Sequence, residues 1–293
     1  MTMHFRVVHT TRISYDGGVA ASYNLARMTP PTTEHQVVVH TRLDVAPTPW
    51  SQTYRDYWGT EVTAFEVLDQ HSELAVTATS TVQVNRPAQQ PGGLGWDDVH
   101  SPDVQDRFCE TLVVDDRVRP DDDLRGRVLA LAEESTGPSD FARRVCQLVW
   151  DEMKYVSGST KVHGHAQDAW AARKGVCQDM AHVAIGALRV ADVPARYVSG
   201  YLHPKRDPQV GETVVGESHA WIEWWDGEWV GFDPTNDIEP GDRHIVVARG
   251  RDYSDVPPLT GIFSGGKTST MAVEVQVTRL LCPCQVHPGL PMG

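Results

Sequence analysis

Cysteine and positive charge are scarce in this chain, and each shortage excludes a class of protein. The 293 residues include five cysteines, an odd and sparse number that argues against a disulfide-stapled fold and leaves at least one free thiol. Lysine and arginine together number 26 against 39 aspartates and glutamates, which gives a net charge of -13. Because no local basic patch interrupts this acidity, we expect no nucleic-acid partner.

Long hydrophobic runs are also missing. No uncharged apolar stretch approaches the ~18 residues of a membrane-spanning helix, and the first residues lack the basic and apolar regions of a secretory signal. We therefore expect a cytoplasmic protein that makes no membrane contact. Hydrophobic residues make up 40% of the chain and charged residues 22%, which is the balance of a globular protein.

The first part of the chain has the pattern of an all-β region. β-branched runs at residues 4–9 and 36–43 are bounded by turn residues, and residues 74–84 alternate between apolar and polar side chains. Short strands with this spacing favour a β-sandwich.

A stretch rich in proline and glycine, residues 86–93, is typical of a linker. The length of the chain also favours two domains. We therefore predict a β-rich domain over residues 1–95 and a second domain over residues 96–293.

The second domain has a mixed pattern. Apolar residues recur at helical spacing over residues 141–149 and again after Cys177, and strand patterns follow at 196–201 and 219–232. Helices followed by antiparallel strands are typical of an α+β fold. Residues 271–277 alternate once more, and we expect them to close the sheet of this domain.

Cys177 is the best candidate for a reactive thiol. A thiol attacks carbonyl carbons as its thiolate, and an ordinary cysteine, with a pKa of ~8.5, is mostly protonated at neutral pH. Gly175 suits a tight turn and Asp179 suits the first turn of a helix that starts near Cys177, where the helix dipole favours the thiolate and free N–H groups can bind an oxyanion. A buried structural cysteine is the alternative, and it is the one we expect for Cys109 and Cys146.

Residues 217–236 have the pattern of a β-hairpin, and its register decides whether His219 and Asp233 can interact. A two-residue loop would send the two side chains to opposite faces. A three-residue loop over residues 225–227, with Gly227 in the left-handed conformation, would place them directly opposite each other. We predict the three-residue loop.

In this register Trp224 pairs with Glu228, and a division of labour follows. His219 would exchange a proton with Cys177, while Asp233 would accept a hydrogen bond from the other ring nitrogen and fix its tautomer. Each of these residues alone is more often structural, and it is their combination that favours catalysis.

Three motifs of the chain resemble the core motifs of the transglutaminase-like superfamily. They are residues 175–179, 218–221 and 232–236. The similarity is greatest to the bacterial branch, whose members are labelled cysteine proteases and carry a β-rich N-terminal domain. The resemblance implies a papain-like core, with helices packed on an antiparallel sheet, and a triad of Cys177, His219 and Asp233 that needs no cofactor.

The resemblance also implies a second oxyanion donor from a side chain upstream of the cysteine, and Tyr155 and Trp150 are both candidates. Tyr155, Trp221 and His165 are the expected substrate contacts. Trp221 and Trp225 share the predicted face of His219 and could line a groove for an extended peptide; core packing is the alternative, and we favour it for Trp224.

Metal binding is weakly indicated. Cys282, Cys284 and His287 supply three possible ligands, but a full site needs a fourth, so we expect surface thiols there. The pair His163 and His165 is more typical of a loop than of a zinc site. We predict neither a metal nor a cofactor.

The sequence therefore predicts a thiol-dependent hydrolase that cleaves amide bonds of a peptide or protein through an acyl-thioester on Cys177. Two alternatives stay open: transfer of the acyl group to an amine, as in a transglutaminase, and a binding module with a vestigial triad. The substrate, the oligomeric state and the role of the N-terminal domain are not indicated by any residue pattern.

Overall fold

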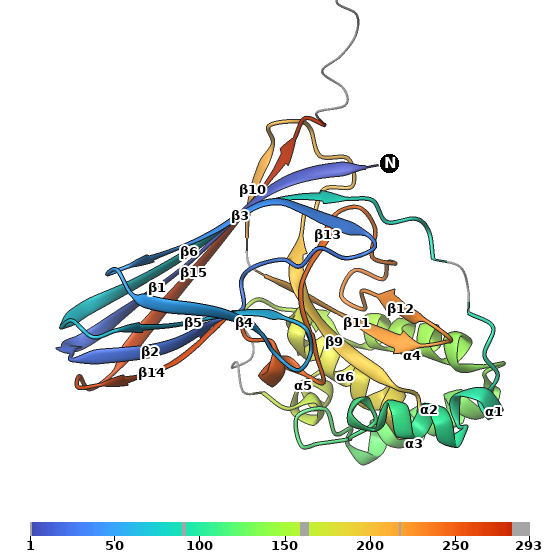
Figure 1. Cartoon of the computed structure of the whole chain (residues 1–293). Helices are drawn as coiled ribbons and strands as arrows, with labels where there is room; N and C mark the ends of the chain where they lie inside the picture. The colour runs from blue at the N-terminus through green and yellow to red at the C-terminus, as the bar shows by residue number, and fades with distance from the viewer. Residues whose placement is uncertain (1, 90–91, 159–163, 217, 283–293) are drawn as a thin grey trace, which may run out of the picture.

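The chain folds into a β-sandwich and an adjoining α+β unit (Figure 1). The computed structural model describes residues 2–89, 92–158, 164–216 and 218–282. Within them, no helix is both long and apolar enough to cross a membrane.

The sandwich has two antiparallel sheets. The first has the order β10 (Thr213–Gly216), β15 (Ser269–Leu280), β1 (Met3–Val19), β6 (His71–Val84) and β3 (Gln36–Ala46). The second has the order β14 (Leu259–Ser264), β2 (Ala21–Ala26), β5 (Glu61–Val67) and β4 (Trp50–Arg55). The strands predicted at residues 4–9, 36–43 and 74–84 are thus confirmed.

Alternating apolar side chains hold the two sheets together. Leu74, Val76 and Ala78 of β6 are buried against Phe65 and Val67 of β5. The residues between them point to the other face, as the period of two in a strand requires.

The strand at residues 271–277 does not close the sheet of the α+β unit as expected. It belongs to β15, which pairs with β1 from His4 opposite Leu280 to Tyr15 opposite Ser269. The strands β14 and β10 also join the sandwich from positions late in the chain. The sandwich is therefore built from both ends of the sequence.

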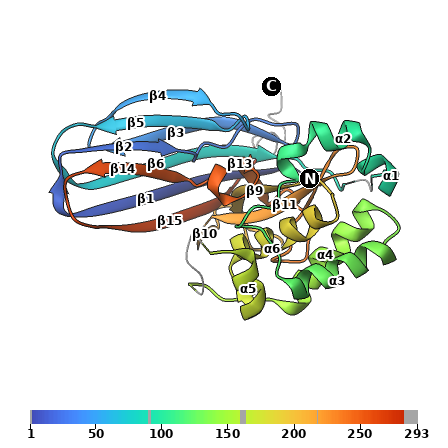
Figure 2. The same cartoon turned by 90° about the horizontal axis from the view of Figure 1, so that it is seen from below.

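The α+β unit has a four-stranded antiparallel sheet in the order β12 (Trp229–Phe232), β11 (His219–Trp225), β9 (Ala195–Leu202) and β13 (His244–Gly250). Its remaining elements are α1 (Trp96–Val99), α2 (Pro102–Arg107), η1 (Cys109–Thr111), α3 (Asp122–Glu134), α4 (Pro138–Glu152), β7 (Lys154–Tyr155), α5 (Ala166–Ala172), β8 (Lys174–Gly175), α6 (Cys177–Val190) and η2 (Tyr253–Asp255). Figure 2 shows α3 to α6 gathered together beside the sandwich.

Helix α6 is the centre of this unit. Its residues from Asp179 to Arg189 are buried, and it packs against β9 and β11 and against α3, α4 and α5. Burial on all sides is possible because most of its residues are apolar and because Asp179, His182 and Arg189 are hydrogen-bonded. The buried position of α6 holds its first residue, Cys177, in a fixed place.

The hairpin register differs from the predicted one. Trp225 pairs with Trp229, so the three-residue loop is Asp226 to Glu228, one residue later than expected, with Gly227 at φ +84° in its middle. The pairing is therefore offset by two residues from the predicted pairing of Trp224 with Glu228. An offset of two keeps each side chain on its predicted face.

The cysteines differ in part from expectation. Cys146 is buried in the core as predicted, whereas Cys109 is an exposed free thiol, so its expected core position is wrong. Cys282 is buried and disulfide-bonded, which overturns the expectation of a surface thiol at that position. Cys284 and His287 lie outside the described residues.

Candidate active site

The start of α6 places Cys177 at a helix N-terminus. Asp179, buried in the first turn, accepts a hydrogen bond at Oδ2 from the backbone N–H of Val176 at 2.7 Å and so closes the helix end. Gly175 makes room for this carboxylate, because a Cβ atom there would lie 2.6 Å from the Cβ of Asp179. Cys177 therefore sits where the helix dipole stabilises a negative charge.

His219 and Asp233 meet, as the sequence predicts. His219 begins β11 and Asp233 follows directly after β12, and the Nε2 of His219 donates to the Oδ2 of Asp233 at 2.7 Å. They are not directly opposite each other, because the ladder ends at the pair Ile222 and Phe232. Asp233 is fully buried and His219 is largely so.

Cys177 completes the arrangement from the other side of the imidazole. Burial alone would lower the pKa of His219, but the charge and hydrogen bond of Asp233, together with the hydrogen bond to Cys177, raise that pKa to about 10. The ring is therefore an imidazolium at neutral pH. A neighbouring imidazolium stabilises the thiolate form of a cysteine.

The carboxylate of Asp233 is held by five hydrogen bonds. Its Oδ1 accepts from the backbone N–H groups of Thr235 and Asn236, and its Oδ2 accepts from the side-chain amide of Asn236 as well as from two imidazoles. Burial would raise the pKa of Asp233, but His219 and then His244 hold it well below its usual range. The carboxylate is thus ionised throughout the neutral range.

His244 belongs to the same hydrogen-bonded cluster, and the sequence does not indicate it. It begins β13, is buried, and its Nε2 lies 3.2 Å from the Oδ2 of Asp233. Its Nδ1 accepts from the backbone N–H of Gly241 at 3.2 Å, which places the ring proton on Nε2. Burial lowers its pKa to about 4, so this imidazole is a neutral donor. The sequence carries no signal for it, since the pairing of β13 with β9 brings it there.

The same three residues have the composition of a metal site. The donor atoms of His219, Asp233 and His244 lie within 4.8 Å of one another. A metal-binding imidazole nitrogen must be free of its proton, however, and the bond from Gly241 keeps the proton on the nitrogen of His244 that faces the group. We interpret the cluster as a hydrogen-bonded network.

A cleft of about 450 Å³ opens at Cys177 and His219. Its lining includes Trp150, Tyr155, Leu202, Pro204, Val214, Val215, Gly216, Ser218, Thr235, Asn236, Val275 and Val277. Both candidates for the second oxyanion donor, Trp150 and Tyr155, are therefore present. Tyr155 reaches the cleft because β7 pairs with β8, which sets it beside Gly175.

Only one of the three predicted substrate contacts lines the cleft. Tyr155 lines the cleft, but Trp221 is fully buried and packs its ring 5.2 Å from the ring of His244 and 6.2 Å from that of His219. Trp225 turns away to pack on Phe108. Trp221 thus packs against the two imidazoles and does not line the cleft.

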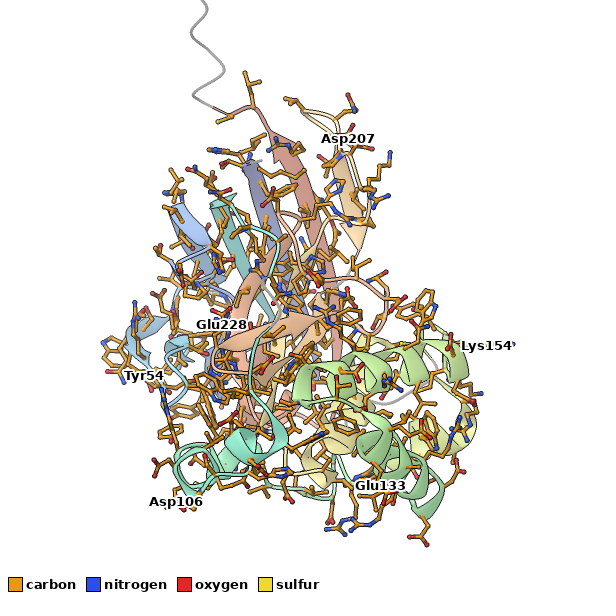
Figure 3. All side chains as sticks on the ribbon, turned by 90° about the vertical axis from the view of Figure 1, so that its right-hand side faces the viewer. Tyr54, Asp106, Glu133, Lys154, Asp207 and Glu228 are labelled. Carbon is orange, nitrogen blue, oxygen red and sulfur yellow. The ribbon has the colours of Figure 1, made fainter. Side chains whose placement is uncertain are left out.

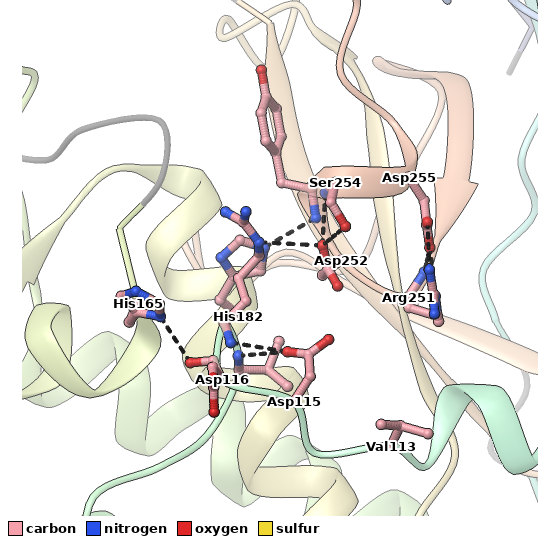
Figure 4. Close-up of polar contacts among 12 residues, drawn as sticks. Val113, Asp115, Asp116, His165, His182, Arg251, Asp252, Ser254 and Asp255 are labelled. Carbon is pink, nitrogen blue, oxygen red and sulfur yellow. Dashed lines mark hydrogen bonds and ion pairs between the residues drawn. The ribbon is translucent and has the colours of Figure 1, made fainter.

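His165 is not among the residues that line the cleft. It lies beside Asp116, close to the polar cluster that includes His182 of α6 and Asp252 (Figure 4). Its Nδ1 donates to the backbone carbonyl of Asp116 at 2.9 Å (Figure 4). Nearby, His182 accepts from the N–H of Tyr253, and Asp252 accepts from Ser254. Burial lowers the pKa of His182 to about 3, so this histidine is neutral and structural.

Trp224 is buried in the core as favoured from the sequence. Its Nε1 donates to the hydroxyl of Ser139 on α4 at 3.0 Å. This bond fastens the hairpin of His219 to the helical layer.

Comparisons with known proteins agree with this architecture. The model of the bacterial transglutaminase-like N-terminal region matches residues 5–83, and that of the transglutaminase-like superfamily core matches residues 127–234. The uncharacterized protein ML0607 of Mycobacterium leprae is 41% identical over 94% of this chain and 98% of its own length. The uncharacterized protein Mb2599c of Mycobacterium bovis is 33% identical over 94% of this chain and 93% of its own.

Two further similarities concern named enzymes. A protein-glutamine gamma-glutamyltransferase of Pseudomonas aeruginosa is 36% identical over 72 residues, which are 23% of this chain and 11% of that protein. The crystal structure of "a Putative Cysteine Protease from Cytophaga hutchinsonii" superimposes with a TM-score of 0.75 at 20% identity, covering 96% of this chain and 92% of that one. The second similarity is one of fold.

Proposed function

Because the chain belongs to the transglutaminase-like superfamily, we propose that it is a thiol-dependent amide hydrolase with the triad Cys177, His219 and Asp233. The observation that carries the proposal is the position of one imidazole between a helix-terminal thiol and a buried carboxylate, which keeps that imidazole protonated at neutral pH. A peptide or protein is the substrate class that the family suggests.

The reaction follows from these positions. The thiolate of Cys177 attacks an amide carbonyl carbon, and the resulting oxyanion is held by N–H groups at the start of α6 and by a side chain on the same side of the cleft, Trp150 of α4 or Tyr155 of β7. His219 then gives its proton to the leaving amine as the C–N bond breaks, which leaves a thioester. Water adds to the thioester while His219 takes up its proton, and departure of the thiolate restores the starting state.

The Asp233 carboxylate keeps His219 in place through this cycle. It stabilises the imidazolium and fixes which ring nitrogen faces Cys177. The five hydrogen bonds that it accepts prevent it from taking the proton itself.

Transfer to an amine is the second candidate. It uses the same thioester, with a lysine amine in place of water, and the local similarity to a protein-glutamine gamma-glutamyltransferase favours it. A binding module with a vestigial triad is less well supported, because all three triad residues and their hydrogen bonds are present.

Thiol labelling tests the proposal. Iodoacetamide at pH 6 should label Cys177 at least ten times faster than the exposed free thiol Cys109, because thiolate is the nucleophile. Peptide mapping by mass spectrometry reads both sites in one sample. Equal, slow labelling of the two would contradict an activated Cys177.

The acceptor is tested separately. Incubation with a glutamine-containing peptide, with and without an added primary amine, should give the free acid under both conditions if the enzyme is a hydrolase. An amide conjugate as the main product would instead assign acyl transfer. The C177A variant, which lacks the nucleophile, is the control in both cases.

A further inference from the structure

The cleft at Cys177 is uncharged apart from its own reacting pair. None of the described residues that line it is an aspartate, glutamate, lysine or arginine, and in the proposed resting state the two opposite charges of the triad cancel each other. A charged side chain that entered would lose water without gaining a counter-ion from these residues, which is strongly unfavourable. An uncharged side chain loses little.

The wall opposite the helices comes from the β-sandwich. Val214 of β10 pairs directly with Val277 of β15, and Val275 lies two residues along, so the three share one face of the sheet. Val275 and Val277 are buried, and Val214 is half-buried at the cleft. The sandwich therefore supplies an aliphatic surface to the site, and Figure 1 shows β10 where the two parts of the molecule meet.

A second hollow adjoins the first and differs in charge. It shares Leu202, Pro204 and Asn236 with the cleft, and it is also lined by Arg206 and Arg243. Its one described acidic residue, Glu239, forms an ion pair with Arg143 at 2.7 Å. Figure 3 labels Asp207, the neighbour of Arg206, on the loop beside the sandwich.

Neither of the two arginines forms a close ion pair with an acidic residue of the described chain. Arg243 donates through Nη1 to the backbone carbonyls of His203 and Pro204, and neither guanidinium has an ion pair among the described residues. Burial lowers the pKa of Arg243 and the positive charge of Arg206 lowers it further, while the negative charge of Asp233 opposes this shift in part. An anionic group placed between them would relieve this repulsion.

We propose, resting on the function proposed above, that the acyl donor is a peptide with two features: an uncharged aliphatic or aromatic side chain in the cleft beside Cys177, and an acidic group that binds Arg206 and Arg243 in the adjoining hollow. The overall charge of -13 then repels acidic peptides in general, and the local arginine pair selects those that carry a suitably placed acid.

Protection of Cys177 from iodoacetamide tests this without requiring turnover. The probes are short acetylated and amidated peptides that hold leucine next to glutamate, in both orders, and the same peptides with glutamine or lysine in place of glutamate. At low salt the glutamate peptides should protect at about fivefold lower concentration than the glutamine peptides, with lysine weakest, and high salt should reduce the difference.

Two variants assign the effect to its residues. R206Q should abolish the preference for glutamate over glutamine. R12Q, at an exposed position of β1 outside both hollows, should keep that preference and the labelling rate of the wild type. V214D should weaken protection by all three peptides, and V39D, on the exposed edge strand β3, is its control.

Equal protection by the three peptides, or a glutamate preference that survives R206Q, would overturn the inference. If V214D does not fold, the wild-type peptide series and R206Q still decide. These outcomes are independent of the proposed function, whose failure shows as slow labelling of Cys177 relative to Cys109 without any peptide.

Discussion

Two imidazoles bind the same oxygen of Asp233 and pack near the same ring of Trp221, but they differ in what their second nitrogen faces. His219, on β11, faces Cys177 at the cleft, and its pKa is raised to about 10. His244, on β13, is enclosed, accepts from Gly241, and has its pKa lowered to about 4. The same carboxylate therefore accepts hydrogen bonds from one charged and one neutral ring. The other surroundings of each ring decide its charge.

This contrast separates two roles. His219 can move a proton because its second nitrogen faces the thiol. His244 cannot, because its second nitrogen is occupied by the backbone, and it acts as a positioning residue that donates a hydrogen bond to the carboxylate.

The largest effect should come from H219A. Removal of the ring takes away the proton donor and the counter-charge of the thiolate, so kcat/KM should fall by about ten-thousandfold, the upper end for general acid–base catalysis. Iodoacetamide labelling of Cys177 should slow to the rate of Cys109. Turnover by H219A well above that of C177A would show that another group supplies the proton.

D233N should lower kcat/KM by about a hundredfold to a thousandfold, within the range of general acid–base catalysis, because the ring of His219 stays but loses its counter-charge. The wild-type activity should fall as pH rises through about 10, where His219 loses its proton. Without the carboxylate, burial pulls the pKa of His219 down, so in D233N this fall should begin at lower pH.

D226N is the matched control for D233N. Asp226 is a buried carboxylate in the loop of the same hairpin, bonded to the backbone N–H of Leu94 and away from the cleft lining. D226N should therefore keep the alkaline limit of activity of the wild type. If D233N kept this limit as well, Asp233 would not be the group that holds the pKa of His219 high.

H244Q should have a smaller effect, about tenfold in kcat, because one hydrogen bond to an ionised carboxylate is weakened while His219 and Asn236 still hold it. A positioning role also predicts a lower alkaline limit of activity, which mere loss of stability would not produce. H71Q is the control, since His71 is a buried histidine of the sandwich with two hydrogen bonds of its own. An H244Q profile identical to that of H71Q would assign His244 a structural role only.

G175A should have the smallest effect. The new Cβ would displace Asp179 from its cap, at a cost of about 1 kcal/mol in unfolding free energy, and would shift Cys177 relative to His219. Thermal unfolding and the labelling rate of Cys177 measure the two consequences. G126A, at an open position of α3, is the control and should not lower stability.

Local patterns in the sequence predict the part of the site that depends on neighbouring residues. Gly175 and Asp179 indicate a helix that starts at Cys177, and the alternation of the hairpin places His219 and Asp233 on one face even though the loop lies one residue later than predicted. The period of two makes this conclusion robust to an offset of two residues.

Pairings between distant segments are not readable in the same way. The alternation at residues 271–277 identifies a strand but not its partner β1, and nothing local indicates that His244 reaches Asp233 or that Val275 lines the cleft. The burial of Trp221 also depends on strands that come together only in the fold. These contacts are set by tertiary packing.

The central claim is that Cys177 is held as a thiolate by the imidazolium of His219. The ultraviolet difference spectrum of the wild type minus C177A, followed from acid to alkaline pH, measures this thiolate directly. The account predicts that the thiolate absorbance is already present at pH 7 and is lost in H219A. A signal that appears only near the ordinary cysteine pKa of ~8.5, and that is the same in H219A, would contradict it.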